Sequence, residues 1–221
     1  MSSTIQQRQD KLEPMLRLAP VIAIVTIDDV NHAVPLARSL IEGGVRGIEV
    51  TLRTPAALAS IEVIRHSVPE SCVGAGTVLT ADDVKASENA GALFFVSPGA
   101  SPALIAATEN SEVPWLPGAA SASEAMTLFE RGYRLQKFFP AEPAGGADFL
   151  RSLAAPLPKI KFCPTGGVRP QTMASYLDLP NVICVGGSWL SPANLMRDKD
   201  WKAITALARA ATGSRPKHSM L

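Results

Sequence analysis

A lysine stands inside a segment whose other residues are typical of a buried strand. Lys137 lies in the run Leu135-Gln136-Lys137-Phe138-Phe139-Pro140, where its side chain would lose most of its hydration. Desolvation favours the neutral amine, and a neutral lysine is the form that attacks a carbonyl carbon to make a Schiff base. The structural alternative is a lysine that pairs with a carboxylate or extends its ammonium out of the strand end.

Three polar residues alternate along a second apolar run, residues 48–53. The two-residue period of a strand puts Glu49, Thr51 and Arg53 on one face and the apolar residues between them on the other. Because the apolar face must pack on helices, we expect the polar face to point into the interior, where Lys137 is also expected. A Glu–Arg pair that only neutralises itself is the structural alternative.

Two glycine pairs near the ends of late apolar runs could bind an anion. Gly166-Gly167 follows Thr165, and Gly186-Gly187 precedes Ser188. Adjacent glycines let successive amides converge on an anion, and the dipole of a following helix adds to the attraction. Either pair alone is more often a tight turn. Together, after the seventh and eighth expected strands, they predict a phosphate site.

Two other run ends carry weaker signals. Gly74-Ala75-Gly76-Thr77 offers a close backbone approach and one hydroxyl, and Ser97-Pro98-Gly99 could equally be a rigid turn. Both follow expected strands, so both would lie at the same mouth as Lys137.

The elements that would position these residues alternate between strand and helix. Helical spacing appears between the apolar runs, as in residues 33–41 and 57–64, with helix starts at Thr80 and Ser121 and glycine stops before the next strands. Eight strands favour an α/β fold of the (β/α)8 TIM barrel type with an extra N-terminal helix, and a doubly wound sheet is the alternative. The expected strands are 21–26, 47–52, 71–75, 93–97, 114–116, 135–139, 160–163 and 182–185.

Length and composition limit the classes of function. The 221 residues suit one barrel domain, and a net charge of +1 with interspersed acids and bases argues against nucleic acid as a partner. The three cysteines are far apart in apolar runs, which predicts small buried residues in a reducing cytoplasm. The three histidines are scattered, so no metal site is predicted.

The two ends of the chain are predicted to differ from the barrel. Residues 1–19 read as a helical extension without the apolar block of a signal peptide, and no run is long enough to span a membrane. Residues 20–212 form the predicted barrel, and residues 213–221 read as a mobile polar tail.

Six blocks in order resemble the class I aldolases that act on 2-keto-3-deoxy-6-phosphogluconate (KDPG) and 4-hydroxy-2-oxoglutarate (KHG). The resemblance covers about residues 20–210. The blocks are Glu49-Val50-Thr51-Leu52-Arg53-Thr54, Gly74-Ala75-Gly76-Thr77, Ser97-Pro98-Gly99, Lys137-Phe138-Phe139-Pro140-Ala141-Glu142, Cys163-Pro164-Thr165-Gly166-Gly167 and Gly186-Gly187-Ser188-Trp189.

The resemblance implies a role for each matching residue. It implies that Lys137 is the Schiff-base lysine and Glu49 the general acid/base. By the same resemblance, Arg53 and Thr77 would hold the keto-acid carboxylate. Pro98, Phe139 and Thr165 would line the pocket. The phosphate would be bound by Gly166, Gly167, Gly187 and Ser188. It further implies catalysis without a cofactor, pyruvate as a product and a homotrimer.

The sequence leaves other functions to be weighed. An aldolase for the galactonate epimer, or one devoted to 4-hydroxy-2-oxoglutarate, would differ only in pocket shape. A non-catalytic barrel that binds sugar phosphates would keep the glycine pairs and leave Lys137 structural. A metal-dependent aldolase is disfavoured by the scattered histidines.

Overall fold

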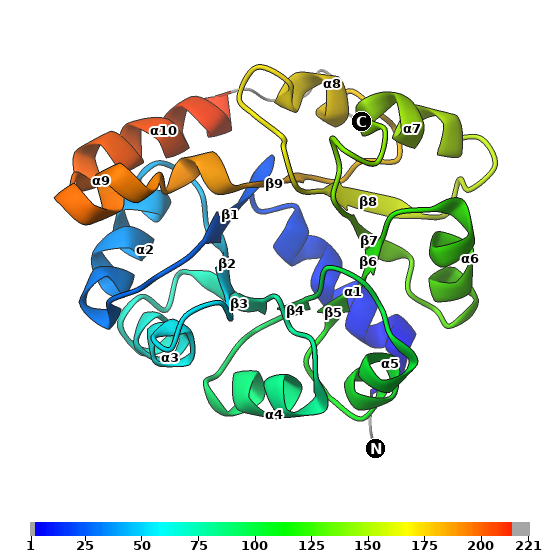
Figure 1. The fold of residues 1–221 in the computed structure, drawn as a ribbon, viewed down its shortest axis with the longest axis horizontal. Helices are drawn as coiled ribbons and strands as arrows, with labels where there is room; N and C mark the ends of the chain where they lie inside the picture. Colours follow the sequence, from blue (N-terminus) through cyan, green and yellow to red (C-terminus); the bar gives the residue numbers. More distant parts are fainter. Residues whose placement is uncertain (1–2, 214–221) are drawn as a thin grey trace.

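In the computed structural model, which describes residues 3–213, a curled parallel sheet lies inside a layer of helices (Figure 1). All of its strand pairs are parallel, as expected for alternating strands and helices. The strands are β1 (Val21–Val25), β2 (Gly47–Thr51), β3 (Cys72–Gly76), β4 (Phe95–Val96), β5 (Trp115–Leu116), β6 (Gly118–Ala119), β7 (Leu135–Phe138), β8 (Lys161–Pro164) and β9 (Val185–Gly187).

Hydrogen bonding divides these strands into two sheets. One has the order β5-β4-β3-β2-β1-β9 and the other the order β6-β7-β8. Two isolated parallel bridges, Phe162 with Val182 and Thr165 with Gly186, join β8 to the segment of β9. Pro117, which has no N–H to donate, separates β5 from β6, and its carbonyl accepts from the Lys137 N–H at 2.8 Å.

The helices other than α1 cover the outside of the sheet and connect its strands. They are α1 (Ile5–Leu16), η1 (Val30–His32), α2 (Ala33–Glu42), α3 (Ala57–Ser67), α4 (Ala81–Asn89), α5 (Pro102–Glu109), α6 (Ala122–Glu130), α7 (Gly146–Leu153), α8 (Met173–Leu177), η2 (Ser188–Leu190), α9 (Ala193–Asp198) and α10 (Trp201–Gly213).

The helix ends follow the local chemistry of the sequence. Thr80 and Ser121 each form a capping box, so their hydroxyls satisfy an amide that has no partner within the helix. After the helices, Gly44, Gly91 and Gly132 adopt positive φ angles, which a glycine accepts without steric cost. The predicted starts and stops at these positions are confirmed.

The last strand begins later than predicted. The apolar run Val182–Val185 suggested a strand there, but β9 is Val185–Gly187 and Val182 makes only an isolated bridge. The partners of β1 decide this register, because Val21, Ile22 and Ala23 pair with residues 185, 186 and 187. A glycine is also needed at 186, since a Cβ there would overlap the Thr165 side chain. The glycine pair expected to follow this strand as part of an anion site therefore lies within the strand.

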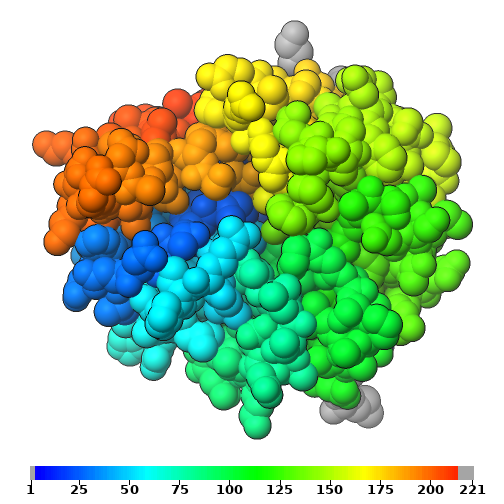
Figure 2. Space-filling model, viewed as in Figure 1, coloured from blue at the N-terminus to red at the C-terminus, as the bar shows by residue number. Residues whose placement is uncertain are grey.

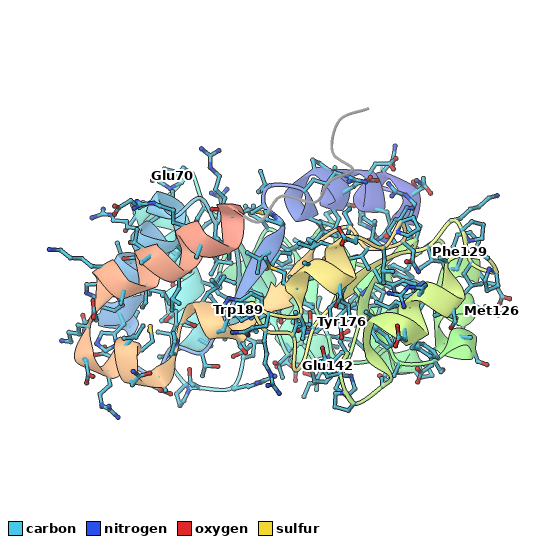
Figure 3. The ribbon with its side chains drawn as sticks, turned by 90° about the horizontal axis from the view of Figure 1, so that it is seen from above. Glu70, Met126, Phe129, Glu142, Tyr176 and Trp189 are labelled. Carbon is cyan, nitrogen blue, oxygen red and sulfur yellow. The ribbon has the colours of Figure 1, made fainter. Side chains whose placement is uncertain are left out.

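Two apolar clusters lie on opposite sides of the curled sheet. The larger cluster packs the outward residues of the strands, such as Ile48 and Val50, against the helices. The smaller cluster lies inside and includes Leu135 of β7 with Leu12 and Leu16 of α1. Helix α1 therefore closes the end of the sheet where the strands begin, and Figure 3 shows it on the side opposite Glu142.

The predicted N-terminal extension, residues 1–19, contains α1. Apart from Gly213, which ends α10, the predicted polar tail lies outside the described residues. The domain boundaries at 19 and 213 stay predictions. Among the described residues, none of the helices combines the length and apolar character that a bilayer crossing requires.

Candidate active site

Lys137 and Glu49 form a buried pair inside the curled sheet. The Lys137 Nζ lies 3.3 Å from Glu49 Oε1, and the two side chains are 5% and 4% exposed. The ammonium also lies 5.1 Å from the centre of the Phe139 ring. The predicted inward direction of both side chains is thus confirmed, and the pair brings together an amine and a carboxylate that can exchange a proton.

The register of the strands gives Glu49 room beside Lys137. Glu49 pairs with Ile24 on β1 and with Gly74 on β3. Two residues further along β3, a Cβ on Gly76 would overlap the Glu49 carboxylate. Glycine at 76 is therefore required by the position of this carboxylate.

Arg53 and Thr77 lie together at the carboxyl ends of β2 and β3. The Arg53 Nε donates a hydrogen bond to Thr77 Oγ1 at 3.1 Å, and Arg53 is exposed to solvent. Thr77 has a φ of 59°, a conformation that is uncommon for a β-branched residue and is often found at functional sites. The planar guanidinium and this hydroxyl could bind a carboxylate together.

Pro98 is held at the same mouth by a short hydrogen-bond chain. Trp115 Nε1 donates to Ser97 Oγ at 3.0 Å, and Ser97 Oγ donates to the Gly99 carbonyl at 2.6 Å. A Cβ on Gly118 would overlap the Pro98 carbonyl, so this loop packs tightly over β6. The segment Ser97-Pro98-Gly99 thus forms the rigid turn that the sequence suggested as a possibility. It lies beside β6, whose Gly118 pairs with Lys137.

The loop after β8 presents two amides that could bind an anion. Gly166 and Gly167 have φ angles of 99° and 83°. The carbonyls of Thr165 and Gly166 accept from the Ala141 and Glu142 amides at 2.8 and 3.0 Å. Because C=O and N–H point in opposite directions across a trans peptide, the Gly166 and Gly167 N–H groups point away from that segment.

Neither of these two glycine N–H groups has a hydrogen-bond partner within residues 3–213. They are therefore free to donate to a ligand, and their binding of an anion stays a prediction. The preceding Thr165 is buried and donates weakly to the Cys163 carbonyl at 3.4 Å.

A cavity of about 460 Å³ lies between the end of β1 and α9 and reaches Ser188, but its lining does not include Lys137 or Glu49. Its lining includes Thr26, His32, Arg197 and Ile24, the last of which is the strand partner of Glu49. Ser188 follows Gly187 at the end of β9 and is exposed. The mouth is built from loops far apart in the sequence, and Figure 2 shows early, middle and late segments meeting around the centre of this face.

Two features of the site were not predicted from the sequence. Thr26 lies in the cavity lining with its Oγ1 3.0 Å from Thr51 Oγ1. The alternation of residues along a strand puts Thr26 on the same inward face as Ile24, so the sequence could have indicated its position. Gln136 donates through Nε2 to the carbonyl of Ala125 within α6 and to that of Tyr133 in the following turn, which ties β7 to the preceding helix.

The described residues contain no group of three or more His, Cys, Asp or Glu side chains that could hold a metal ion. The three cysteines, Cys72, Cys163 and Cys184, are free and buried, as the sequence predicted.

Comparison with known proteins agrees with this geometry. The family model described as KDPG and KHG aldolase matches residues 12–207. The chain is 47% identical to a 2-dehydro-3-deoxy-phosphogluconate aldolase of Pseudoalteromonas atlantica over 87% of this chain and 89% of that protein. It is 43% identical to the KHG/KDPG aldolase of Escherichia coli over 90% of this chain and 93% of that protein.

Solved structures give the same result. KDPG aldolase from Legionella pneumophila, crystallised with pyruvate captured as a covalent carbinolamine intermediate, superimposes with a TM-score of 0.88 at 42% identity, covering 90% of this chain and 96% of that chain. A structure described as native KDPGal has a TM-score of 0.78 at 28% identity, covering 88% and 93%.

Proposed function

The chain belongs to the KDPG and KHG aldolase family, and from this premise we propose that it is a class I aldolase. It cleaves 2-keto-3-deoxy-6-phosphogluconate to pyruvate and glyceraldehyde 3-phosphate, and 4-hydroxy-2-oxoglutarate to pyruvate and glyoxylate. The observation that carries the proposal is the buried contact of 3.3 Å between Lys137 Nζ and Glu49 Oε1, because Schiff-base chemistry needs a lysine amine next to a proton acceptor.

The reaction begins with proton transfer from the Lys137 ammonium to the Glu49 carboxylate. The neutral amine attacks the C2 carbonyl of the substrate to give a carbinolamine. Protonated Glu49 then gives its proton to the departing hydroxide, which leaves as water and produces a protonated imine.

The imine is the electron sink for carbon–carbon cleavage. Glu49, again a carboxylate, takes the proton of the C4 hydroxyl, the C3–C4 bond breaks, and its electron pair forms the enamine of pyruvate on Lys137. Glu49 returns that proton to C3. Addition of water at C2 then releases pyruvate and regenerates the amine.

Substrate binding is assigned to the residues around this pair. Arg53 and Thr77 hold the carboxylate, and Pro98, Phe139 and Thr165 line the pocket. The phosphate lies at Gly166 and Gly167 on one loop and at Gly187 and Ser188 on the next. The two unpartnered glycine N–H groups support the phosphate end of this assignment.

We further propose that the curled sheet is an eight-stranded (β/α)8 barrel in which Pro117 interrupts one strand to give β5 and β6. The two bridges between β8 and the β9 segment support closure. We also propose a homotrimer, as the family resemblance implies, and action in the cytoplasm. Light scattering tests the trimer, for which a mass of about 70 kDa is expected from chains of 23.3 kDa.

The galactonate-epimer aldolase is the alternative within the same chemistry. The lower identity to the KDPGal structure, 28% against 42% for the Legionella enzyme, favours the gluconate epimer. Comparison of kcat/KM on the two epimers decides between them, and a larger value for the galactonate epimer would reverse this assignment.

The proposal is tested by borohydride trapping with pyruvate, followed by intact mass and peptide mapping. We expect an adduct on Lys137, no adduct in Lys137→Arg, and a normal adduct in the control Lys161→Arg, whose native Nζ donates to the Pro180 carbonyl. Absence of an adduct from a folded protein that still binds a sugar phosphate would instead support the non-catalytic barrel.

A further inference from the structure

A hydrogen bond outside the reacting pair connects the loop after Lys137 to helix α8. Tyr176 OH donates to Glu142 Oε1 at 2.9 Å, across 34 residues of sequence. Glu142 lies five positions after Lys137, beyond the end of β7, whereas Tyr176 belongs to α8. Figure 3 shows the two labelled side chains close together on the side of the molecule opposite α1.

The tyrosine is buried and its hydroxyl is fixed as a donor. Tyr176 is 1% exposed. Burial, followed by the hydrogen bond to the Glu142 carboxylate, raises the pKa of Tyr176 well above its ordinary value of 10.0. The hydroxyl therefore stays protonated and holds one carboxylate oxygen in place.

Glu142 in turn packs against the glycine loop that is proposed to bind phosphate. Its amide donates to the Gly166 carbonyl at 3.0 Å. A Cβ placed on Gly167 would lie 2.7 Å from both Cβ and Cγ of Glu142, so the aliphatic part of the side chain covers the Gly167 Cα. The position of the Glu142 side chain thus determines where the Gly166 and Gly167 amides can point.

Electrostatics alone does not explain a carboxylate at this place. A negative charge next to an anion-binding loop weakens the binding of a phosphate. A role in positioning the loop explains the carboxylate, because a carboxylate accepts a stronger hydrogen bond from a phenol than a neutral group does.

We propose that Tyr176 and Glu142 are positioning residues that hold the Gly166-Gly167 loop in the conformation that binds the phosphate of the substrate. Neither residue touches the reacting atoms. The pair therefore contributes to the preference for phosphorylated 2-keto acids over shorter, unphosphorylated ones. This inference rests on the proposed function and names two further residues for its phosphate end.

The test compares kcat and KM on two substrates, KDPG with a phosphate and 4-hydroxy-2-oxoglutarate without one. For Tyr176→Phe we expect the ratio of kcat/KM values, KDPG over 4-hydroxy-2-oxoglutarate, to fall about fivefold. The change should come from KM for KDPG. Glu142→Ala should behave in the same way, and Glu142→Gln, whose amide oxygen still accepts from Tyr176, should restore the ratio to within about twofold of the wild type.

Tyr133→Phe is the matched control. Tyr133 is also buried, but its ring packs edge-on against Trp115, away from the glycine loop. It should keep the wild-type substrate ratio.

Equal losses on both substrates in Tyr176→Phe, or a ratio that Glu142→Gln does not restore, would overturn the positioning role. Pyruvate trapping on Lys137 separates this failure from a failure of the proposed function. An adduct with an unchanged substrate ratio rejects only the Tyr176–Glu142 role, whereas a missing adduct in the wild type rejects the aldolase itself.

Discussion

At the scale of single residues, the Glu49 carboxylate lies beside Lys137 only because residue 76 has no side chain. In Gly76→Ala the new methyl group would overlap the carboxylate and displace it from Lys137. We expect kcat to fall about a hundredfold or more, since small displacements of a catalytic group are costly. The free energy of unfolding should fall by about 1–3 kcal/mol. Steady-state kinetics and urea unfolding measure the two effects.

Gly99→Ala is the control for this substitution. A Cβ at Gly99 meets no atom within 4 Å, so the free energy of unfolding should stay within about 0.5 kcal/mol of the wild type. If Gly76→Ala keeps full activity, the carboxylate position seen here is not the one that catalyses the reaction.

Arg53 tests the carboxylate end of the site. Arg53→Lys keeps the positive charge but loses the planar fork and the contact of 3.1 Å from Nε to Thr77 Oγ1. We expect kcat/KM to fall about tenfold to a hundredfold on both KDPG and 4-hydroxy-2-oxoglutarate, because both substrates carry the keto-acid carboxylate. Arg46→Lys, at the opposite end of β2, should keep wild-type kinetics. An unchanged kcat/KM in Arg53→Lys would exclude this role.

At the scale of elements, α1 completes the hydrogen bonding of two strands. Gln9 Nε2 donates to the Trp115 carbonyl of β5 at 3.0 Å, and the Leu135 amide of β7 donates to Gln9 Oε1 at 2.8 Å. Arg8 lies beside it, donating to carbonyls at the end of α5, including Thr108 at 3.2 Å. Since β5 and β7 do not pair with each other, α1 supplies the hydrogen bonds that these backbone groups would otherwise lack.

Gln9→Met should therefore destabilise the protein by about 2–4 kcal/mol, because it leaves two buried backbone groups without partners. Urea unfolding measures the loss, with Gln6→Met on the exposed face of α1 as the control. Equal stability of the two variants would show that water replaces the Gln9 side chain.

The sequence predicted some of these elements better than others. Strand alternation in residues 48–53 correctly placed Glu49, which points inward from β2. It did not place Arg53, because β2 ends at Thr51 and Arg53 lies exposed in the turn that follows. The β9 register was wrong, because the pairing with β1 depends on contacts between residues far apart in the chain. The sequence predicted α1 only as a helical extension, since nothing local shows that Gln9 reaches two strands.

At the scale of the whole molecule, the alternation of strands and helices and the number of strands predicted the α/β architecture. The attachment of the first helix, α1, depends on charged residues, which the periodicity of apolar residues does not reveal. Arg134, just before β7, bonds to Asp10 Oδ1 at 2.7 Å and to Glu13 Oε2 at 2.6 Å. These partners are about 120 positions distant in the sequence, so only the folded chain brings them together.

These contacts make the stability of the molecule depend on pH. The hydrogen bond from Arg134 lowers the pKa of Asp10 below its ordinary 3.8. Partial burial raises the pKa of Glu13, but hydrogen bonds from Arg17 and Arg134 outweigh it, so the pKa falls below its ordinary 4.5. Since both folded-state pKa values are depressed, the stabilisation is present above about pH 4.5. It is lost as pH falls through the lowered values, where the unfolded chain binds more protons.

We therefore expect the wild type to lose unfolding free energy between pH 5 and pH 3 more steeply than Arg134→Met, in which both carboxyl groups lose this partner. Urea unfolding at several pH values measures the two slopes. Arg131→Met removes an exposed ion pair with Glu109 at 3.4 Å, and it should keep the wild-type slope. Parallel curves for the wild type and Arg134→Met would mean that α1 is held by its apolar residues and Gln9, with no measurable contribution from these charges.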